Sequence, residues 1–242
     1  MPAKKTGKKP AKKEAPEAET PGAEVDKSPP RGAVQDLIIA EKNIAARKLA
    51  DLLGEGKVKK SKVKSVDVYE IKWDGGRSAA LVGLKGHIVE LTYPKQYRSW
   101  QRVPLQDLIQ AEPERSVKEK GISDALKTLA KGAERVIIAT DFDREGELIG
   151  VEALEQVRKS SKEGVEVKRA RYSAFTKEEI RRAFGSLTAV DQRLADSAHA
   201  RQMVDLAWGA VLTRFISLSS GQLGSDFLSV GRVQSPTLAV LV

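Results

Sequence analysis

The sequence predicts an α/β domain with a mixed or parallel sheet over residues 35–174 and a wholly helical segment over residues 175–242. In the first range, short runs of β-branched and apolar residues alternate with helical patterns, which is typical of α/β folds. One such run, Val136 to Thr140, leads directly into an acid-rich turn and then into an apolar helical pattern. Beyond about residue 175 only helical periodicity remains.

The individual elements are indicated by apolar runs, stripes and turn residues. Leu37–Ala40 is a short apolar strand, and the helix after it carries a stripe that includes Leu49 and Leu53 and ends at Gly54. The triplet 74–76, Asp-Gly-Gly, predicts a hairpin turn between two strands. In chain order the expected elements are strand 37–40, helix 44–53, strands 66–73, 78–84 and 87–92, helix 123–130, strand 135–140, helix 145–158, strand 167–172, helices 176–184 and 190–217, a loop at 219–224 and a helix from 231 onward.

Residues 1–34 differ in composition from the rest of the chain. They hold seven lysines and one arginine against five acidic residues, and almost nothing apolar. Such a segment cannot bury enough surface to offset its ordering entropy, so we expect a disordered basic tail. Its lysine pairs could touch DNA phosphates without sequence preference, although a solubilising role fits the composition equally well.

Composition excludes several classes of protein. The net charge is +9, with 42 basic and 33 acidic side chains in 242 residues, which suits a polyanionic partner. The absence of cysteine excludes disulfides and cysteine-based zinc sites within this sequence. No apolar run approaches the ~20 residues that span a bilayer, and the basic N-terminus lacks an apolar h-region, so we expect a cytoplasmic protein without a membrane partner. No Gly-x4-Gly-Lys-[Ser/Thr] pattern occurs, so no ATP site is expected.

The acid-rich turn is the feature that indicates chemistry. Asp141, Asp143, Glu145 and Glu147 stand within seven residues at the carboxyl end of the expected buried strand, which is where α/β sheets bind ligands. Four carboxylates repel one another unless a cation lies between them. Side chains at i and i+2 of an extended backbone point the same way, so Asp141 and Asp143 can face one hard cation such as Mg²⁺. The ordinary alternative, acidic residues at a helix N-terminus, accounts for one or two carboxylates but not for four.

Two residues after the first strand complete this set. Glu41 lies beside the acid cluster if the first strand and the strand before the cluster are neighbours in the sheet. Facing two aspartates and a metal, it would suit either acid–base work or metal coordination. Lys42 could hold a phosphate as a point charge. A charge at a helix N-terminus for Glu41 and a surface lysine for Lys42 are the plain alternatives.

These segments resemble the motifs of a known family. Residues 141–147, Asp-Phe-Asp-Arg-Glu-Gly-Glu, resemble the Asp-x-Asp-x-Glu signature of the Toprim domain, in the full form found in type IA DNA topoisomerases. Residues 37–42 resemble that family's first strand, which ends in an essential glutamate. Residues 229–235, Ser-Val-Gly-Arg-Val-Gln-Ser, resemble the segment that opens its gate domains. The three motifs stand in the family's order over roughly residues 35–242, and residues 83–97 look closest to the archaeal topoisomerase I branch.

The resemblance implies a Rossmann-like Toprim domain over residues 35–174, followed by the start of an all-helical gate domain over residues 175–242. It implies Mg²⁺ as cofactor, with Glu41, Asp141 and Asp143 as metal residues and Glu41, Lys42 and Glu145 as catalytic residues. The DNA-binding residues that it implies are Tyr172, Ser173, Thr176, Arg181, Arg201, Asp205, Ser229, Gly231, Arg232 and Gln234.

The residues themselves leave simpler readings open for two of these sets. Ser173 and Thr176 also fit a strand exit followed by a helix N-cap. Arg201 and Asp205, four positions apart on a helix, also fit a local ion pair.

The resemblance also implies an activity. Type IA enzymes cleave single-stranded segments of negatively supercoiled DNA through a 5′-phosphotyrosine, pass a strand and religate without ATP, and we expect a nucleoid-associated monomer. The family's nucleophile lies well after the Gly-Arg-Val-Gln segment, whereas the tyrosines here, at 69, 93, 97 and 172, all precede it. We therefore expect an N-terminal part that lacks the nucleophile and is inactive alone. The alternatives are a topoisomerase III-like decatenase and a noncatalytic Toprim DNA-binding fragment; another Toprim enzyme, such as a primase, is disfavoured by residues 231–234.

Histidine and tryptophan add little to this assignment. Neither His87 nor His199 has a metal-ligand neighbour at a recognisable spacing, so structural roles are favoured for both. Trp100 is expected to pack, although Arg98 and Arg102 beside it leave open an aromatic and basic surface for nucleic acid.

Overall fold

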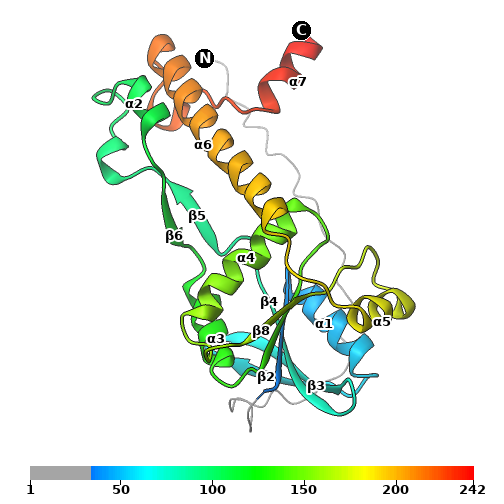
Figure 1. The fold of residues 1–242 in the computed structure, drawn as a ribbon. Coiled ribbons are helices and arrows are strands. Elements are labelled where there is room, and N and C mark those ends of the chain that lie inside the picture. Colours follow the sequence, from blue (N-terminus) through cyan, green and yellow to red (C-terminus); the bar gives the residue numbers. More distant parts are fainter. Residues whose placement is uncertain (1–33) are drawn as a thin grey trace, which may run out of the picture.

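A six-stranded mixed sheet forms the centre of the molecule, with strand order β2-β3-β4-β1-β7-β8 (Figure 1). The computed structural model describes residues 34–242, so the expected tail lies outside the described residues apart from residue 34. The strands are β1 (Asp36–Ala40), β2 (Lys59–Val63), β3 (Val66–Trp73), β4 (Arg77–Gly83), β7 (Arg135–Ala139) and β8 (Glu166–Arg169). β1 pairs in parallel with β4 and β7, and β7 with β8, while β2, β3 and β4 run antiparallel to one another in turn. The predicted α/β class is confirmed.

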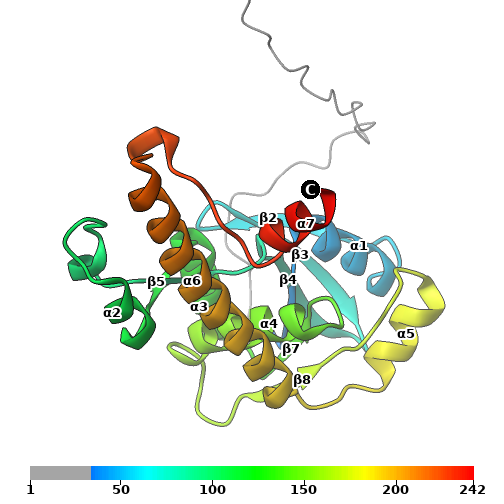
Figure 2. The ribbon, with the colours of Figure 1, turned by 90° about the horizontal axis from the view of Figure 1, so that it is seen from above.

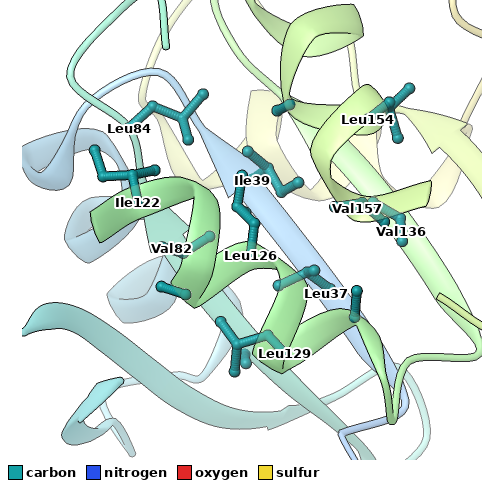
Figure 3. Close-up of a cluster of buried hydrophobic side chains, with 14 of the residues drawn as sticks. Leu37, Ile39, Val82, Leu84, Ile122, Leu126, Leu129, Val136, Leu154 and Val157 are labelled. Atoms are coloured by element: carbon teal, nitrogen blue, oxygen red, sulfur yellow. The ribbon is translucent and has the colours of Figure 1, made fainter. Parts of the chain in front are cut away.

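β1 is buried on both faces because helices cover both sides of the sheet. Leu37 and Ile39 belong to the cluster on one face (Figure 3), packed against α3 and α4. Ile38 and Ala40 belong to the cluster on the other face, packed against α1 and α5. Since side chains alternate along a strand, a continuous apolar run serves both layers. The covering helices are α1 (Asn43–Leu53), α3 (Lys120–Ala130), α4 (Arg144–Arg158) and α5 (Lys177–Gly185).

A buried carboxylate fixes the opposite end of the sheet from the acid cluster. Asp36, fully buried at the start of β1, accepts hydrogen bonds from Trp73 Nε1 at 2.9 Å, Arg77 Nε at 3.0 Å and Arg135 Nε at 3.0 Å. Burial acts to raise the pKa of Asp36, but the hydrogen bonds from the two arginines outweigh it and hold that pKa below its ordinary value. The amino ends of β1, β4 and β7 are thereby tied together.

A second unit extends from the sheet along the longest helix. α6 packs against α4 beside the sheet and continues past β5 to α2, so its far end lies away from the sheet (Figures 1 and 2). None of the helices in residues 34–242 is long and apolar enough to cross a bilayer. The elements of this unit are β5 (Val89–Thr92), β6 (Glu114–Val117), the 3₁₀ helices η1 (Lys95–Tyr97) and η2 (Gly224–Asp226), α2 (Leu105–Gln110), α6 (Gln192–Ser220) and α7 (Gln234–Leu241).

Several elements differ from the sequence-based expectation. β2 and β6 are not predicted, because each carries a single apolar residue and shows no period. α2 is not predicted either, because its six residues are too few for a helical period to stand out. The α1 stripe is centred on Leu49 with Ala46 and Ala50, which are fully buried, while Leu53 is only half-buried. The last strand ends at Arg169, earlier than expected, and α6 continues through Ser220 into the range expected to be a loop.

Candidate functional site

The ends of β1 and β7 bring Glu41 and the acid cluster to one edge of the sheet. The two strands are parallel neighbours, with Ala40 opposite Ala139. Glu41 therefore follows β1 at the same edge at which Asp141 follows β7. The side chains interact electrostatically: burial raises the pKa of Asp141, and the negative charge of Glu41 raises it further. The two strands are therefore neighbours, which is the condition under which the sequence placed Glu41 beside the acid cluster.

Lys42 forms an ion pair with the neighbouring Glu41. Lys42 Nζ lies 3.2 Å from Glu41 Oε1, and this hydrogen bond raises the pKa of Lys42. The Glu41 side chain is 14% exposed and that of Lys42 is 67% exposed. The carboxylates of Glu41 and Asp141 offer oxygen ligands, and burial destabilises the charged form of Asp141, so the two acids suit a divalent metal ion.

The turn after β7 uses one of the predicted metal ligands as a helix cap. Asp143 Oδ1 accepts a hydrogen bond from Gly146 N at 2.7 Å at the start of α4. Within residues 34–242, no group of three or more acidic or histidine side chains is close enough to hold a metal ion. The triplet of Glu41, Asp141 and Asp143 as metal residues therefore stays a prediction. The turn is tight, because a Cβ on Gly146 would lie 2.1 Å from the carbonyl oxygen of Asp141.

The fourth acid of the cluster has a structural role that the sequence analysis does not assign. Glu147 is fully buried and its Oε2 accepts a 2.7 Å hydrogen bond from Arg169 Nε, which is also fully buried. Arg169 Nη1 donates to the carbonyl of Thr140 at 2.9 Å, and Nη2 to that of Asp141 at 2.8 Å. The signal that could have found this pair is a glutamate on the core-facing side of an expected helix, since an acid there requires a buried partner.

A chain of ion pairs joins the acid cluster to two distant segments. Glu145 Oε1 lies 2.7 Å from Arg201 Nη1 on α6. Arg201 Nε lies 3.6 Å from Asp205 Oδ2, and Asp205 in turn pairs with Arg232 through both of its carboxylate oxygens. The local Arg201–Asp205 pair is therefore present, but the shorter contact of Arg201 is with Glu145. Four residues that the sequence singles out separately form one connected polar strip.

His87 lies beside this strip and was expected to be structural. Its Nδ1 is 3.1 Å from Oε1 of the buried Glu152, and its Nε2 is 3.4 Å from Glu145 Oε2. Gln202 Nε2 on α6 lies 3.2 Å from His87 Nε2. The hydrogen bond with Glu152 raises the pKa of His87 and outweighs the opposing effect of burial. His87 thus connects α4 with α6.

The remaining predicted DNA residues fall in two places. Tyr172 is 4% exposed and its hydroxyl donates to the carbonyl of Ala139 at 2.6 Å, so a DNA contact through this hydroxyl would require that bond to break. Thr176 caps α5 by accepting from Glu179 N at 3.3 Å, as the simpler reading has it. Exposed Ser173 lies before that cap, and Arg181 on α5 pairs with Glu55 at 2.6 Å.

The last segment lies along α6. Ser229 Oγ is 3.5 Å from Gln234 Oε1, and Gly231 precedes Arg232 of the ion-pair strip. Contacts of these residues with DNA, like those of the group around α5, stay predictions.

Comparison with known families places this geometry in a class. The model of the Toprim domain matches residues 36–175, and the model of a DNA topoisomerase domain matches residues 189–242. The first match covers the sheet whose edge carries Glu41 and Asp141. By these two matches the chain belongs to the Toprim-containing family of type IA DNA topoisomerases.

The individual relatives include archaeal and bacterial DNA topoisomerases I. DNA topoisomerase 1 of Archaeoglobus fulgidus is 54% identical over 206 residues, which are 85% of this chain and 30% of that protein. DNA topoisomerase 1 of Thermoplasma acidophilum is 45% identical over 85% of this chain and 26% of that protein. The solved structure of full-length topoisomerase I from Thermotoga maritima is 26% identical with a TM-score of 0.56, over 84% of this chain and 29% of that one. The chain thus spans about 30% or less of the length of these relatives.

Proposed function

We infer that this chain serves an ATP-independent type IA topoisomerase that relaxes negatively supercoiled DNA by Mg²⁺-dependent cleavage and religation of one strand. The observation that carries the proposal is the meeting of Glu41 and Asp141 at the parallel ends of β1 and β7, with Lys42 beside them. The net charge of +9 agrees with a DNA partner. The similarity to archaeal DNA topoisomerase 1 supports the same reading.

Each residue of the edge has a distinct task in this proposal. Asp141 and Asp143 would hold Mg²⁺, which when bound supplies positive charge beside the reacting phosphate. Glu41 exchanges a proton with the 3′ oxygen as it leaves and returns, and Lys42 holds the neighbouring phosphate. Glu145 orients Arg201, whose guanidinium then faces the DNA backbone together with Arg232. For Asp143 to reach a metal, it must give up or share its cap at Gly146.

The attacking tyrosine is not expected among the four of this chain. The hydroxyl of Tyr69 donates to Asn43 Oδ1, that of Tyr93 to the carbonyl of Leu108, and that of Tyr172 to the carbonyl of Ala139. Tyr69 and Tyr172 are also buried, and burial raises the pKa of both. Buried hydroxyls with raised pKa values are poor nucleophiles.

The test joins this chain to the part of Archaeoglobus fulgidus DNA topoisomerase 1 that lies beyond the matched region. We expect the chimera to relax negatively supercoiled plasmid with Mg²⁺ and without ATP. The substitutions Asp141→Asn and Asp143→Asn together should abolish relaxation, while Asp124→Asn, an exposed acid on α3, should leave it unchanged. Relaxation that survives the double substitution, or that persists in excess EDTA, would overturn the assignment.

Decatenation is a second candidate activity. DNA topoisomerase 3-alpha of Homo sapiens is 36% identical over 88% of this chain and 22% of that protein. Linked single-stranded DNA circles, given to the same chimera, distinguish a decatenase from an enzyme that mainly relaxes supercoils. Faster unlinking than plasmid relaxation would favour the decatenase, and the reverse would favour the proposal above.

A further inference from the structure

The outer edge of the sheet carries a dense group of lysines that no step of the proposed function uses. Residues 57–72, which include β2 and most of β3, hold six lysines and two acidic residues. β2 is the first strand in the sheet order, so within residues 34–242 one of its sides has no neighbouring strand. Lysines on such an edge oppose pairing with another chain. That role requires neither so many charges of one sign nor cations from other elements beside them.

A cation from a helix joins this edge. The hydrogen bond with Asp67 raises the pKa of Lys60, and the positive charge of Arg47 on α1 acts in the opposite direction, so the two cations are close. Asp67 lies 2.9 Å from Lys60 Nζ and 3.9 Å from Lys62 Nζ. One carboxylate shared by two lysines, with an arginine nearby, leaves the group with a net positive charge.

A cavity of about 400 Å³ adjoins these lysines. Its walls include Lys62, Lys64 and Lys85. Both acids in the walls are already paired with lysine, because Asp67 contacts Lys62 and Glu119 lies 3.2 Å from Lys85 Nζ. Lys64 forms no ion pair with any residue of the part of the chain that the structure describes, so it is available to an external anion.

The cavity lies at the same edge of the sheet as the acid cluster. β1 is parallel to β4, and β3 is antiparallel to both β4 and β2, so β1, β4 and β2 all run in one direction. Lys42, Lys85 and Lys64 follow the ends of these three strands, and Lys42 pairs with Lys85 in an isolated β-bridge. The ends of β1 and β2 are three strand spacings apart, which is about 14 Å at ~4.8 Å each.

The chemistry of this surface fits the phosphates of duplex DNA. None of the described residues that line the cavity is aromatic, and the Tyr69 ring near Lys60 is only 3% exposed. Sites for single strands combine positive charge with aromatic rings on which the bases stack. A duplex keeps its bases stacked inside and presents its phosphates outward, so flexible lysines that act as point charges can bind it without rings.

We propose that Lys60, Lys62, Lys64 and Lys85, here called the lysine edge, bind the backbone phosphates of duplex DNA. This inference goes beyond the proposed function, which concerns a single strand at the acid cluster, and rests on it only in taking DNA as the partner. The duplex is the arm that adjoins the single-stranded segment, since the cavity and the acid cluster share one edge of the sheet. Contacts with phosphates carry no sequence information, so the arm is bound whatever its sequence.

The test measures binding of a fluorescein-labelled duplex of about 16 base pairs to this chain by anisotropy, between about 0.05 and 0.2 M salt. We expect Lys62→Gln together with Lys64→Gln to weaken binding about 10- to 60-fold at ~0.1 M salt. The salt slope should fall by about 1.8, which is ~0.9 for each phosphate contact on B-DNA. A double variant whose affinity and salt slope for the duplex equal those of the unmodified chain would overturn the proposal.

The matched control removes two lysines from the other edge of the sheet. Lys131 and Lys162 are exposed and precede β7 and β8, so they lie at the amino ends of those strands. Lys131→Gln together with Lys162→Gln changes the net charge by the same amount and should leave duplex affinity and slope unchanged. An equal loss in this control would show that net charge alone acts, and would overturn the lysine edge.

A single-stranded oligothymidylate of about 12 nucleotides separates this inference from the proposed function. Its binding should change less than about 2-fold in the Lys62 and Lys64 double variant, because the lysine edge offers no rings for its bases. An equal loss for single strand and duplex would overturn the assignment to duplex DNA and leave the proposed function standing. If the unmodified chain binds only the duplex, and the double variant loses it as expected, the lysine edge is supported and the proposed single-strand site fails.

Two further measurements separate charge from structure and DNA from other polyanions. Lys62→Arg together with Lys64→Arg keeps both charges and should keep duplex binding, so a loss there would overturn a role in charge. The urea midpoint of the glutamine variant should not change, since both side chains are exposed. Poly-glutamate that displaces the duplex at an equal concentration of charge would identify a surface for acidic proteins and reject duplex DNA.

Discussion

Arg169 and Glu147 form an ion pair of 2.7 Å in which both side chains are fully buried. Arg169 also donates to the carbonyls of the turn after β7, and the second oxygen of Glu147 accepts from Asp191 N at 2.6 Å, just before α6. One pair therefore fastens the acid-bearing turn to the start of the long helix. It sets where Asp141 stands relative to the ion-pair strip, although neither side chain is exposed to a ligand.

Removal of one partner should destabilise the fold strongly. We expect Arg169→Met to cost about 3–5 kcal/mol, because Glu147 would stay buried without its cation. Lys168→Met, one position away in the same edge strand, removes a partly exposed lysine and should change stability by no more than about 0.5 kcal/mol. Urea unfolding followed by circular dichroism measures both. Similar midpoints for the two variants would refute the role assigned to Arg169.

Substitutions of Asp143 should distinguish its role as the N-cap of α4 from its role as a charged metal ligand. Asparagine is as good an N-cap as aspartate, so Asp143→Asn should keep stability, whereas Asp143→Ala should lose about 1 kcal/mol. Both variants remove a negative charge, so both should weaken Mg²⁺ binding measured by isothermal titration calorimetry. If the asparagine variant binds Mg²⁺ like the unmodified chain, the carboxylate is a cap and not a ligand.

Gly146 should not tolerate a side chain. An alanine Cβ would lie 2.1 Å from the carbonyl oxygen of Asp141 and 2.9 Å from its carbonyl carbon, so the turn would have to move. We expect Gly146→Ala to lower the urea midpoint and to abolish relaxation by the chimera. Gly185→Ala, at the end of α5, meets no atom within 4 Å and serves as the control. A Gly146→Ala chimera with full activity would contradict the close packing of this turn.

The free energy of unfolding should depend on pH near neutrality because of His87. Its pKa is raised in the folded chain by Glu152, above the ordinary value of about 6.5. The stabilisation is therefore complete below about pH 6.5 and is lost as the pH rises through the folded-state pKa. We expect His87→Gln to flatten the fall in unfolding free energy between pH 6 and pH 9. His199→Gln, at a histidine without an ion pair in residues 34–242, should keep it, and equal slopes in the two variants would reject the pairing.

The sequence predicts the central elements because their patterns are strong. β1 and β7 are apolar throughout after their first, charged residue, and Asp74-Gly75-Gly76 forms the expected turn, with positive φ at all three residues. β2 escapes notice because it is an edge strand of Lys-Lys-Ser-Lys-Val, in which only Ser61 and Val63 are buried. Lysines on an edge strand oppose pairing with a strand of another chain. The same lysines make β2 hard to predict from its sequence and protect its edge against such pairing.

The candidate site is predicted in its location but not in its internal bonds. Adjacent parallel strands place Glu41 near Asp141, which follows from topology alone. The partners of Glu145 and Glu147 do not follow, because Arg201 and Arg169 are distant in sequence and no local period relates them. The burial of Arg214 on α6 is not predicted either, since a lone arginine in a helical pattern gives no sign that it will be buried.

The 29 residues of α6 make it about 43 Å long at ~1.5 Å per residue. Its hydrogen bonds to Glu147, Glu145 and His87, made by Asp191, Arg201 and Gln202, all lie within about its first three turns. The displacement that a tilt produces therefore grows along the helix. A tilt of about 5° at Asp191 moves Arg201 by roughly 1 Å but Ser220 by roughly 4 Å, from the same rise per residue. Small rearrangements at the Glu147–Arg169 pair therefore change the spacing at the α2 end far more than the spacing at the acid-bearing turn.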